Sequence, residues 1–130
     1  MQMIEAVRRV LSNYVTFSGR AARPEYWWWA LAVFLGSGVF YLLDMALFAP
    51  VPDAAGVEGG PVQIFSGLFG LAVVLPMLAV AARRLHDTDR SAKWLLIGLV
   101  PLIGGLVLLW FYVQRGTEGP NRFGPPAPPL

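Results

Sequence analysis

Three apolar stretches, each long enough to cross a bilayer, occupy residues 26–49, 62–82 and 94–113 of this chain. A helix needs about 20 apolar residues to span a hydrocarbon core about 30 Å thick. The only formally charged side chain within the three stretches is Asp44, near the end of the first, where we expect it to reach water. The sequence therefore predicts an all-α integral membrane protein with three transmembrane helices.

The composition supports this prediction and excludes several other classes of protein. Hydrophobic residues make up 56% of the chain and charged residues 14%, against about 25% charged residues in a soluble domain. A length of 130 residues allows one membrane domain. The net charge of +2 gives little support for a nucleic-acid partner, and without cysteine there is neither a disulfide framework nor a thiolate metal site. We expect no metal and no cofactor.

Both ends of the chain differ in character from the apolar stretches. Residues 3–17 predict an amphipathic helix, because apolar residues recur there at three- and four-residue spacing while Glu5, Arg8 and Arg9 take the other face. Such a helix either lies on the membrane surface and offers arginine to anionic lipid, or packs on the ends of the transmembrane helices; both remain open. Residues 114–130 are rich in glycine and proline and predict a loosely ordered tail.

The distribution of lysine and arginine predicts the orientation. With the amino terminus in the cytoplasm and three full spans, only Arg115 and Arg122 of the ten basic residues lie outside. In the middle of the third stretch, Pro101 and two glycines leave a re-entrant hairpin open as the alternative, with all ten inside. We favour the full span, which places the tail on the outer face, near the loop at residues 50–61.

Polar residues gather on the expected cytoplasmic face and form the candidate site. Its members are Arg20, Arg23, Glu25, Arg83, Arg84, His86, Asp87 and Arg90. The first interpretation is structural: charges pair across the two segments, with Glu25 on an arginine of the 83–90 loop and Asp87 on Arg20 or Arg23. The second is a site for an anionic lipid headgroup or a phosphorylated small molecule, since arginine suits phosphate.

Catalysis and transport are the remaining functional alternatives. In an enzyme, His86 would be the general acid or base, oriented by Asp87 or Glu25. The sequence shows no framed nucleophile, no set of metal ligands and no glycine-rich phosphate loop, so we do not expect an enzyme. Three nearly charge-free helices offer no ion path within one protomer, so transport would require a homo-oligomer. Other membrane proteins are possible partners as well.

Three motifs contain most of the distinctive polar residues. The first, F-x-G-R-x-x-R-x-E-[FY]-W, is matched by Phe17, Gly19, Arg20, Arg23, Glu25, Tyr26 and Trp27. The second, R-R-L-H-D-T-x-R-S, is matched by Arg83, Arg84, Leu85, His86, Asp87, Thr88, Arg90 and Ser91, with Trp94 after it. The third, G-x-x-G-x-N-x-[FY]-G, is matched by Gly116, Gly119, Asn121, Phe123 and Gly124.

In order and spacing over residues 10–125, these motifs resemble those of domain of unknown function family 805, the YhaH-like small bacterial inner membrane proteins. The resemblance implies a multi-pass helical protein of the bacterial inner membrane whose activity is not established. Two positions depart from the family pattern: Pro126 and Ala127 stand where an acidic residue commonly precedes proline, and Lys93 replaces an aromatic or small residue. The sequence thus predicts a structural or interaction module in the inner membrane.

Overall fold

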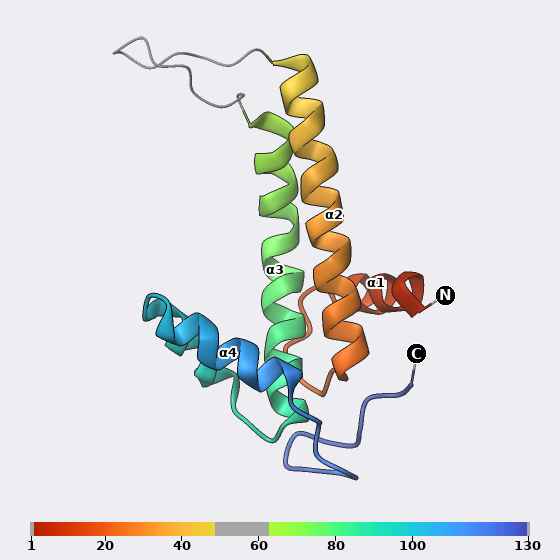
Figure 1. The fold of residues 1–130 in the computed structure, drawn as a ribbon. Coiled ribbons are helices and arrows are strands. Elements are labelled where there is room, and N and C mark those ends of the chain that lie inside the picture. Colours follow the sequence, from red (N-terminus) through yellow and green to blue (C-terminus); the bar gives the residue numbers. More distant parts are fainter. Residues whose placement is uncertain (1, 49–62, 130) are drawn as a thin grey trace. The chain divides into compact units, whose positions relative to one another are not determined.

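A computed structural model describes residues 2–48 and 63–129 of the chain, and its regular structure there is helical (Figure 1). The helices, in chain order, are α1 (Gln2–Ser12), α2 (Arg23–Leu47), α3 (Ile64–Asp87), the 3-10 helix η1 (Ala92–Leu99) and α4 (Ile103–Val113). Within the described residues the only extended pairing is an isolated bridge between Asn121 and Gly124. The predicted all-α class is confirmed, whereas the loop at residues 50–61 and the adjoining ends of the first two stretches lie outside the described residues.

Two of these helices, α2 and α3, are long and apolar enough to cross a membrane, and they correspond to the first two apolar stretches. The start of α2 suits its sequence, because Pro24 lacks only an N–H that has no helical partner there, and Glu25 complements the helix dipole. Helix α3 continues through Pro76 and past the predicted boundary at residue 82. The first residues of the second motif are therefore part of α3.

The chain divides into two compact units, and the smaller one comprises Leu31–Val74. Within it, aromatic rings of α2 and α3 meet: Phe40 and Phe69 lie 5.0 Å apart, centroid to centroid. Gly36 permits this approach, because a Cβ atom at that position would lie 2.8 Å from the Phe69 ring. Small and aromatic side chains thus bring the two helices close together in this unit, as is usual in lipid.

Asp44 lies in the smaller unit, and our expectation that it reaches water is wrong. Its side chain is fully buried. One carboxylate oxygen accepts a hydrogen bond from the backbone N–H of Phe65 at 3.0 Å, and the other accepts one from Ser66 at 2.9 Å. These N–H groups belong to the first turn of α3 and have no partner within the helix. Asp44 therefore caps α3 from the neighbouring helix.

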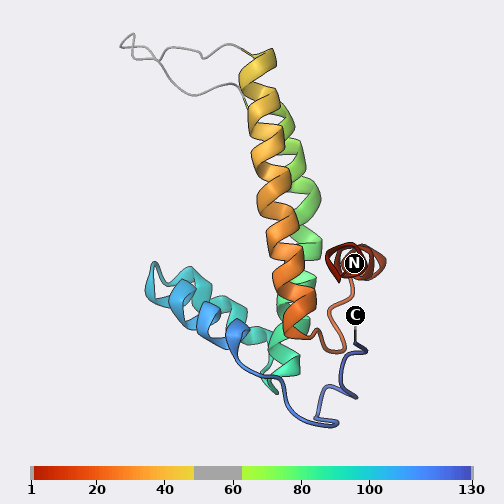
Figure 2. The same ribbon diagram turned by 45° about the vertical axis from the view of Figure 1, so that its right-hand side comes forward.

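The third apolar stretch is not one helix, so the prediction of a single span over residues 94–113 is wrong. The 3-10 helix η1 and helix α4 are separated by Val100, Pro101 and Leu102. The φ of Leu102 is 65°, and the chain reverses direction there. The two pieces pack against each other (Figures 1 and 2). Gly104 makes this possible, because a Cβ atom there would overlap the carbonyl oxygen of Ile97. With 11 residues, α4 is about 16 Å long, roughly half of a hydrocarbon core.

The larger unit, Met1–Ala30 with Leu75–Leu130, contains this hairpin, α1 and the three motifs. Helix α1 is shorter than the predicted 3–17, because the side chain of Asn13 donates to the Arg9 carbonyl and a turn follows. Ala6 and Val10 are fully buried, so one face of α1 packs within the unit. The interior of this unit is formed largely by the last three turns of α3, which position the polar cluster.

Candidate functional site

The candidate site lies where the C-terminal end of α3 meets the segment that leads into α2. The backbone N–H of Ala21 donates to the carbonyl of Arg83 at 3.0 Å, which holds the first and second motifs together. Six charged or titratable side chains are buried there: Arg20, Glu25, Arg83, Arg84, His86 and Asp87. Because isolated buried charges are strongly disfavoured, their pairing determines what this cluster can do.

Asp87 is the centre of the cluster. Its Oδ1 accepts a hydrogen bond from Nε of Arg20 at 2.9 Å, and its Oδ2 accepts one from Nη1 of Arg84 at 2.6 Å. All three side chains are at least nine-tenths buried. One carboxylate therefore joins the segment before α2 to the end of α3, and the expected pairing of Asp87 with Arg20 forms.

Backbone carbonyls occupy the remaining donors of these two arginines. Arg20 donates to the carbonyls of Gly119 at 2.7 Å and Thr117 at 2.6 Å. Arg84 donates through Nε to the carbonyl of Tyr112 at 3.2 Å and through Nη2 to the carbonyl of Gln114. Each of the three guanidinium nitrogens of both arginines thus has an acceptor within the chain, so neither arginine presents a free fork to a ligand.

A second ion pair joins Glu25 to Arg83, with Oε2 accepting from Nη1 at 3.0 Å. Arg9 of α1 lies at 3.7 Å from Oε1 of the same carboxylate. Glu25 and Arg83 are both buried, yet Nε and Nη2 of Arg83 have no hydrogen-bond acceptor. The expected pairing of Glu25 with an arginine of the second motif is present, and two guanidinium nitrogens of Arg83 have no acceptor.

His86 is held in place through both its ring and its backbone. Its Nδ1 lies 2.9 Å from the carbonyl oxygen of Gly19, and because a carbonyl only accepts, Nδ1 carries the hydrogen. The ring stacks on Phe123 with centroids 4.1 Å apart, and Asn121 donates to the His86 carbonyl at 2.9 Å. All three motifs therefore meet at this histidine.

The tail docks on the cluster, a contact that the favoured full span of the third stretch did not predict. The N–H of Thr117 donates to the Asp87 carbonyl at 2.7 Å, and Arg122 pairs with Asp89 at 3.2 Å. Gly116 passes so close to the Asp87 carboxylate that a Cβ atom there would overlap it. The third apolar stretch folds back as a hairpin, and this returns the tail to the end of α3 where the chain left it.

Two candidate site residues lie outside the buried cluster. Arg23 is exposed and donates to the carbonyl of Val113 at 3.2 Å, so it holds the end of α4. The guanidinium of Arg90 lies 4.2 Å from the centroid of the Phe111 ring, a cation–π contact. These two arginines therefore contact the hairpin, and they do not join Asp87 or Glu25.

The other motif residues serve local structure. Trp27 donates through its indole N–H to the carbonyl of Tyr112 at 3.2 Å. Ser91 caps η1 by accepting from the N–H of Lys93 at 3.2 Å, and Trp94 meets Phe111 edge to face at 5.3 Å. Positive φ angles occur at three motif glycines, where the chain turns in a way that favours glycine: Gly19, Gly119 and Gly124. Phe17 is 42% exposed and contributes little packing.

Sequence reasoning missed several members of the cluster. Arg9 donates to the carbonyls of Pro128 at 2.6 Å and Pro129 at 3.1 Å. Through this one side chain, α1 contacts both the end of the tail and Glu25. The backbone acceptors from the tail were missed too, because every residue has a carbonyl and no side-chain signal marks those that point inward. Among the described residues, no group of three or more histidine or acidic side chains could hold a metal ion.

Comparison with known proteins places the chain in a family. The model of a protein family of unknown function, DUF805, matches residues 14–125. The inner membrane protein YhaH of Escherichia coli K12 is 49% identical over 117 residues, covering 90% of this chain and 91% of the relative. The inner membrane protein YhaI of the same strain is 45% identical over 115 residues, covering 88% of each chain. No solved structure matches. These relatives support an inner membrane location, and the chain belongs to the DUF805 family of membrane proteins of unknown function.

Proposed function

We propose that this protein is a structural module of the inner membrane, in which α2 and α3 cross the bilayer and the buried cluster fixes their cytoplasmic ends to the tail. In this arrangement the hairpin of η1 and α4 enters one leaflet without crossing it, and α1 lies at the interface. The module has no catalytic activity of its own. Its role is to present the outer surface of a rigid cytoplasmic cap to lipid or to other membrane proteins.

The basic residues support this topology. Two crossings and a re-entrant hairpin put both termini on one side, together with every lysine and arginine. These residues are Arg8, Arg9, Arg20, Arg23, Arg83, Arg84, Arg90, Lys93, Arg115 and Arg122. The loop between the two crossings carries only acidic charges, Asp53 and Glu58. Because basic residues mark the cytoplasmic side, both termini are cytoplasmic in this proposal.

The observation that carries the structural role is that every guanidinium nitrogen of Arg20 and Arg84 has an acceptor within the chain. A headgroup site needs guanidinium donors that face an open space, and here Asp87 and four backbone carbonyls occupy them. Those acceptors come from three separate segments: the end of α3, the end of α4 and the tail. Such an arrangement ties segments together and leaves no room for a ligand at these two arginines.

The same reasoning applies to the residues considered for catalysis. The Nδ1 of His86 is bonded to a carbonyl, one ring face is stacked on Phe123, and both neighbouring carboxylates are held in ion pairs. A general acid or base must reach the proton of a substrate, and a base oriented by a carboxylate would be bonded to it. Here His86 is bonded to Gly19, so its position suits a packing role.

A second candidate function, binding of a phosphorylated small molecule or headgroup, is favoured by one observation at Arg83. Its Nε and Nη2 atoms are buried without an acceptor. The Glu25 carboxylate, with which Arg83 pairs, also has the positive charge of Arg9 beside it. A phosphate group would supply the missing acceptors. The two candidates therefore differ at Arg83, and they make different predictions for the effect of anions on stability.

Thermal unfolding of the purified full-length protein tests the proposal. We expect inorganic phosphate and glycerol phosphate to leave the melting temperature unchanged at constant ionic strength, and we expect Arg84→Gln to lower it. Arg115→Gln is the matched control, because it removes the same charge from an exposed pair with Glu118. A rise in the melting temperature with phosphate that is lost in Arg83→Gln would favour the second candidate over the structural role.

A further inference from the structure

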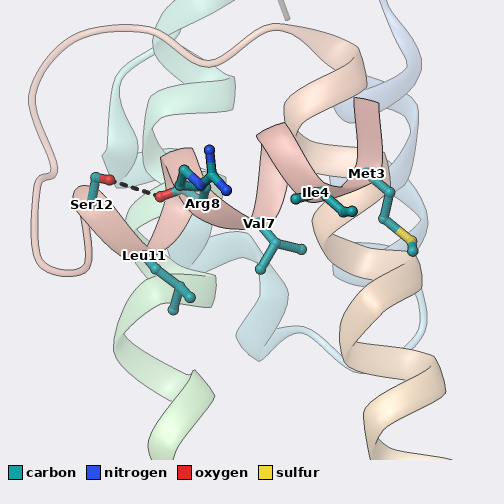
Figure 3. Close-up of a pocket in the computed structure, with 6 residues that line it drawn as sticks. All are labelled: Met3, Ile4, Val7, Arg8, Leu11 and Ser12. Carbon is teal, nitrogen blue, oxygen red and sulfur yellow. Dashed lines mark hydrogen bonds between the residues drawn. The ribbon is translucent and has the colours of Figure 1, made fainter. Parts of the chain in front are cut away.

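Helix α1 has an outer face on which Ile4, Arg8 and Leu11 are exposed and Val7 is half-buried. Away from the buried Ala6 and Val10, the residues at positions 4, 7, 8 and 11 follow the i, i+3, i+4, i+7 spacing of one helical face. Arg8, which we expected on the polar face of the helix, therefore lies beside the exposed apolar residues. They form a shallow groove together with the two residues at its ends; its lining is Met3, Ile4, Val7, Arg8, Leu11 and Ser12 (Figure 3). Ile4 and Leu11 are 51% and 50% exposed, which is unfavourable in water.

The groove contains a single charged group, Arg8, whose guanidinium has no hydrogen-bond or ion-pair partner in the part of the chain that the structure describes. Its neighbour Arg9 points to the other side and is bonded to Glu25 and the tail. One arginine of the pair is therefore used internally, and the other stands beside an exposed apolar surface. Apolar side chains with one unpaired cation match the two chemical parts of an anionic phospholipid.

We infer that this face of α1 is a binding site for an anionic phospholipid of the surrounding membrane. The acyl chain lies along Ile4, Val7 and Leu11, and the headgroup phosphate accepts hydrogen bonds from the Arg8 guanidinium. The groove has a volume of about 590 Å³ and is open along its length, so a lipid chain can lie in it from the surrounding membrane. The inference rests on the proposed interfacial position of α1, and it adds the class of ligand and the residue that selects it.

Arginine at this position suits the role for two reasons. Its long aliphatic stem can lie along the apolar face while the guanidinium reaches the level of the headgroups. Its planar fork donates two parallel hydrogen bonds to phosphate, which a lysine cannot do. We therefore expect Arg8→Gln to weaken binding and Arg8→Lys to retain only part of it.

Native mass spectrometry of the full-length protein, released from detergent with phosphatidylglycerol or phosphatidylcholine, tests the site. We expect retention of phosphatidylglycerol over phosphatidylcholine, and a loss of about fivefold in Arg8→Gln, because one basic residue near an anionic surface has about that effect. Arg115→Gln, which removes an exposed charge from the tail, is the matched control and should retain lipid as the native chain does. Equal retention by Arg8→Gln and the native chain, or equal retention of both lipids, would overturn the inference.

A spin label distinguishes failure of the site from failure of the interfacial position. Because the chain has no cysteine, Leu11→Cys and Glu5→Cys each carry one label, at positions about 120° apart around α1. In nanodiscs we expect the label at position 11 to be accessible to oxygen and shielded from a water-soluble nickel chelate, with the reverse at position 5. If position 11 is in lipid but Arg8→Gln retains phosphatidylglycerol, the specific site is refuted and the interfacial position stands. If position 11 is in water, both are refuted.

Discussion

Replacing Asp87 with asparagine should destabilise the protein more than any other single removal of charge. Asp87 is 6% exposed and is shared by Arg20 and Arg84, two buried arginines. Asparagine keeps one oxygen acceptor, but its amide group presents N–H to the second guanidinium, which leaves a buried cation without a counter-charge. Breaking a buried ion pair by removing one partner costs about 3–5 kcal/mol. This is a large part of the total stability of about 5–15 kcal/mol that is usual for a small domain.

Thermal unfolding in detergent, followed by tryptophan fluorescence, measures this loss. For a chain of this size we expect the melting temperature to fall by about 10 °C or more. Asp89→Asn is the matched control two residues away: Asp89 pairs with Arg122 at an exposed site, worth about 0–1 kcal/mol, and asparagine tolerates its φ of 60°. If Asp87→Asn were no less stable than Asp89→Asn, the view that Asp87 joins the helix ends would be refuted.

Two further predictions concern the hairpin and the tail. Gly104→Ala should open the contact between η1 and α4, because the new Cβ would overlap the Ile97 carbonyl, whereas Gly105→Ala meets no atom and should leave it intact; a lower melting temperature for both variants would contradict this. Phe123→Ala should remove the ring stacked on His86 and release the tail to limited proteolysis by elastase, with the helical circular dichroism unchanged. An unchanged cleavage rate would show that the stacking does not hold the tail.

Hydropathy was enough to predict the two long apolar helices α2 and α3 but not where they end. The predicted second span stopped at residue 82, because polar residues follow, yet α3 continues to Asp87. A helix can carry charges at its end when they are paired. Arg83 pairs with Glu25 of α2, and Arg84 pairs with Asp87 one turn further along α3. The positions of such partners depend on tertiary structure, which hydropathy does not include.

The third apolar stretch shows where hydropathy fails altogether. It is uniformly apolar, and so its hydropathy does not distinguish one long helix from two short ones. The chain reverses at Pro101 and Leu102, and Gly104 lets the two pieces touch. Pro101 and the glycines were the available signal, and a kinked span had been the favoured interpretation because lipid tolerates proline in helices.

The candidate site was predicted in part. Opposite charges in the first two motifs identified the Glu25–Arg83 and Asp87–Arg20 pairs. The contact of the third motif with His86 could be predicted only if the tail returned to the end of α3, and that depended on the hairpin. The internal acceptors of Arg20 and Arg84 include carbonyls of the tail, which carry no sequence signal. Asp44 was misjudged because its partners are backbone N–H groups of the next helix.

The central claim is that the tail and the charged cluster lie on the same side of the membrane and form one unit. Single cysteines test it directly, since the native chain has none: Ser18→Cys lies at an unspecified position within the first motif, and Ala127→Cys lies in the tail. Both variants are treated in intact cells, and then in permeabilised cells, with a membrane-impermeant maleimide. We predict that neither is labelled until the membrane is breached and that both are labelled afterwards. Labelling of Ala127→Cys but not Ser18→Cys in intact cells would place the tail on the opposite face and contradict the account.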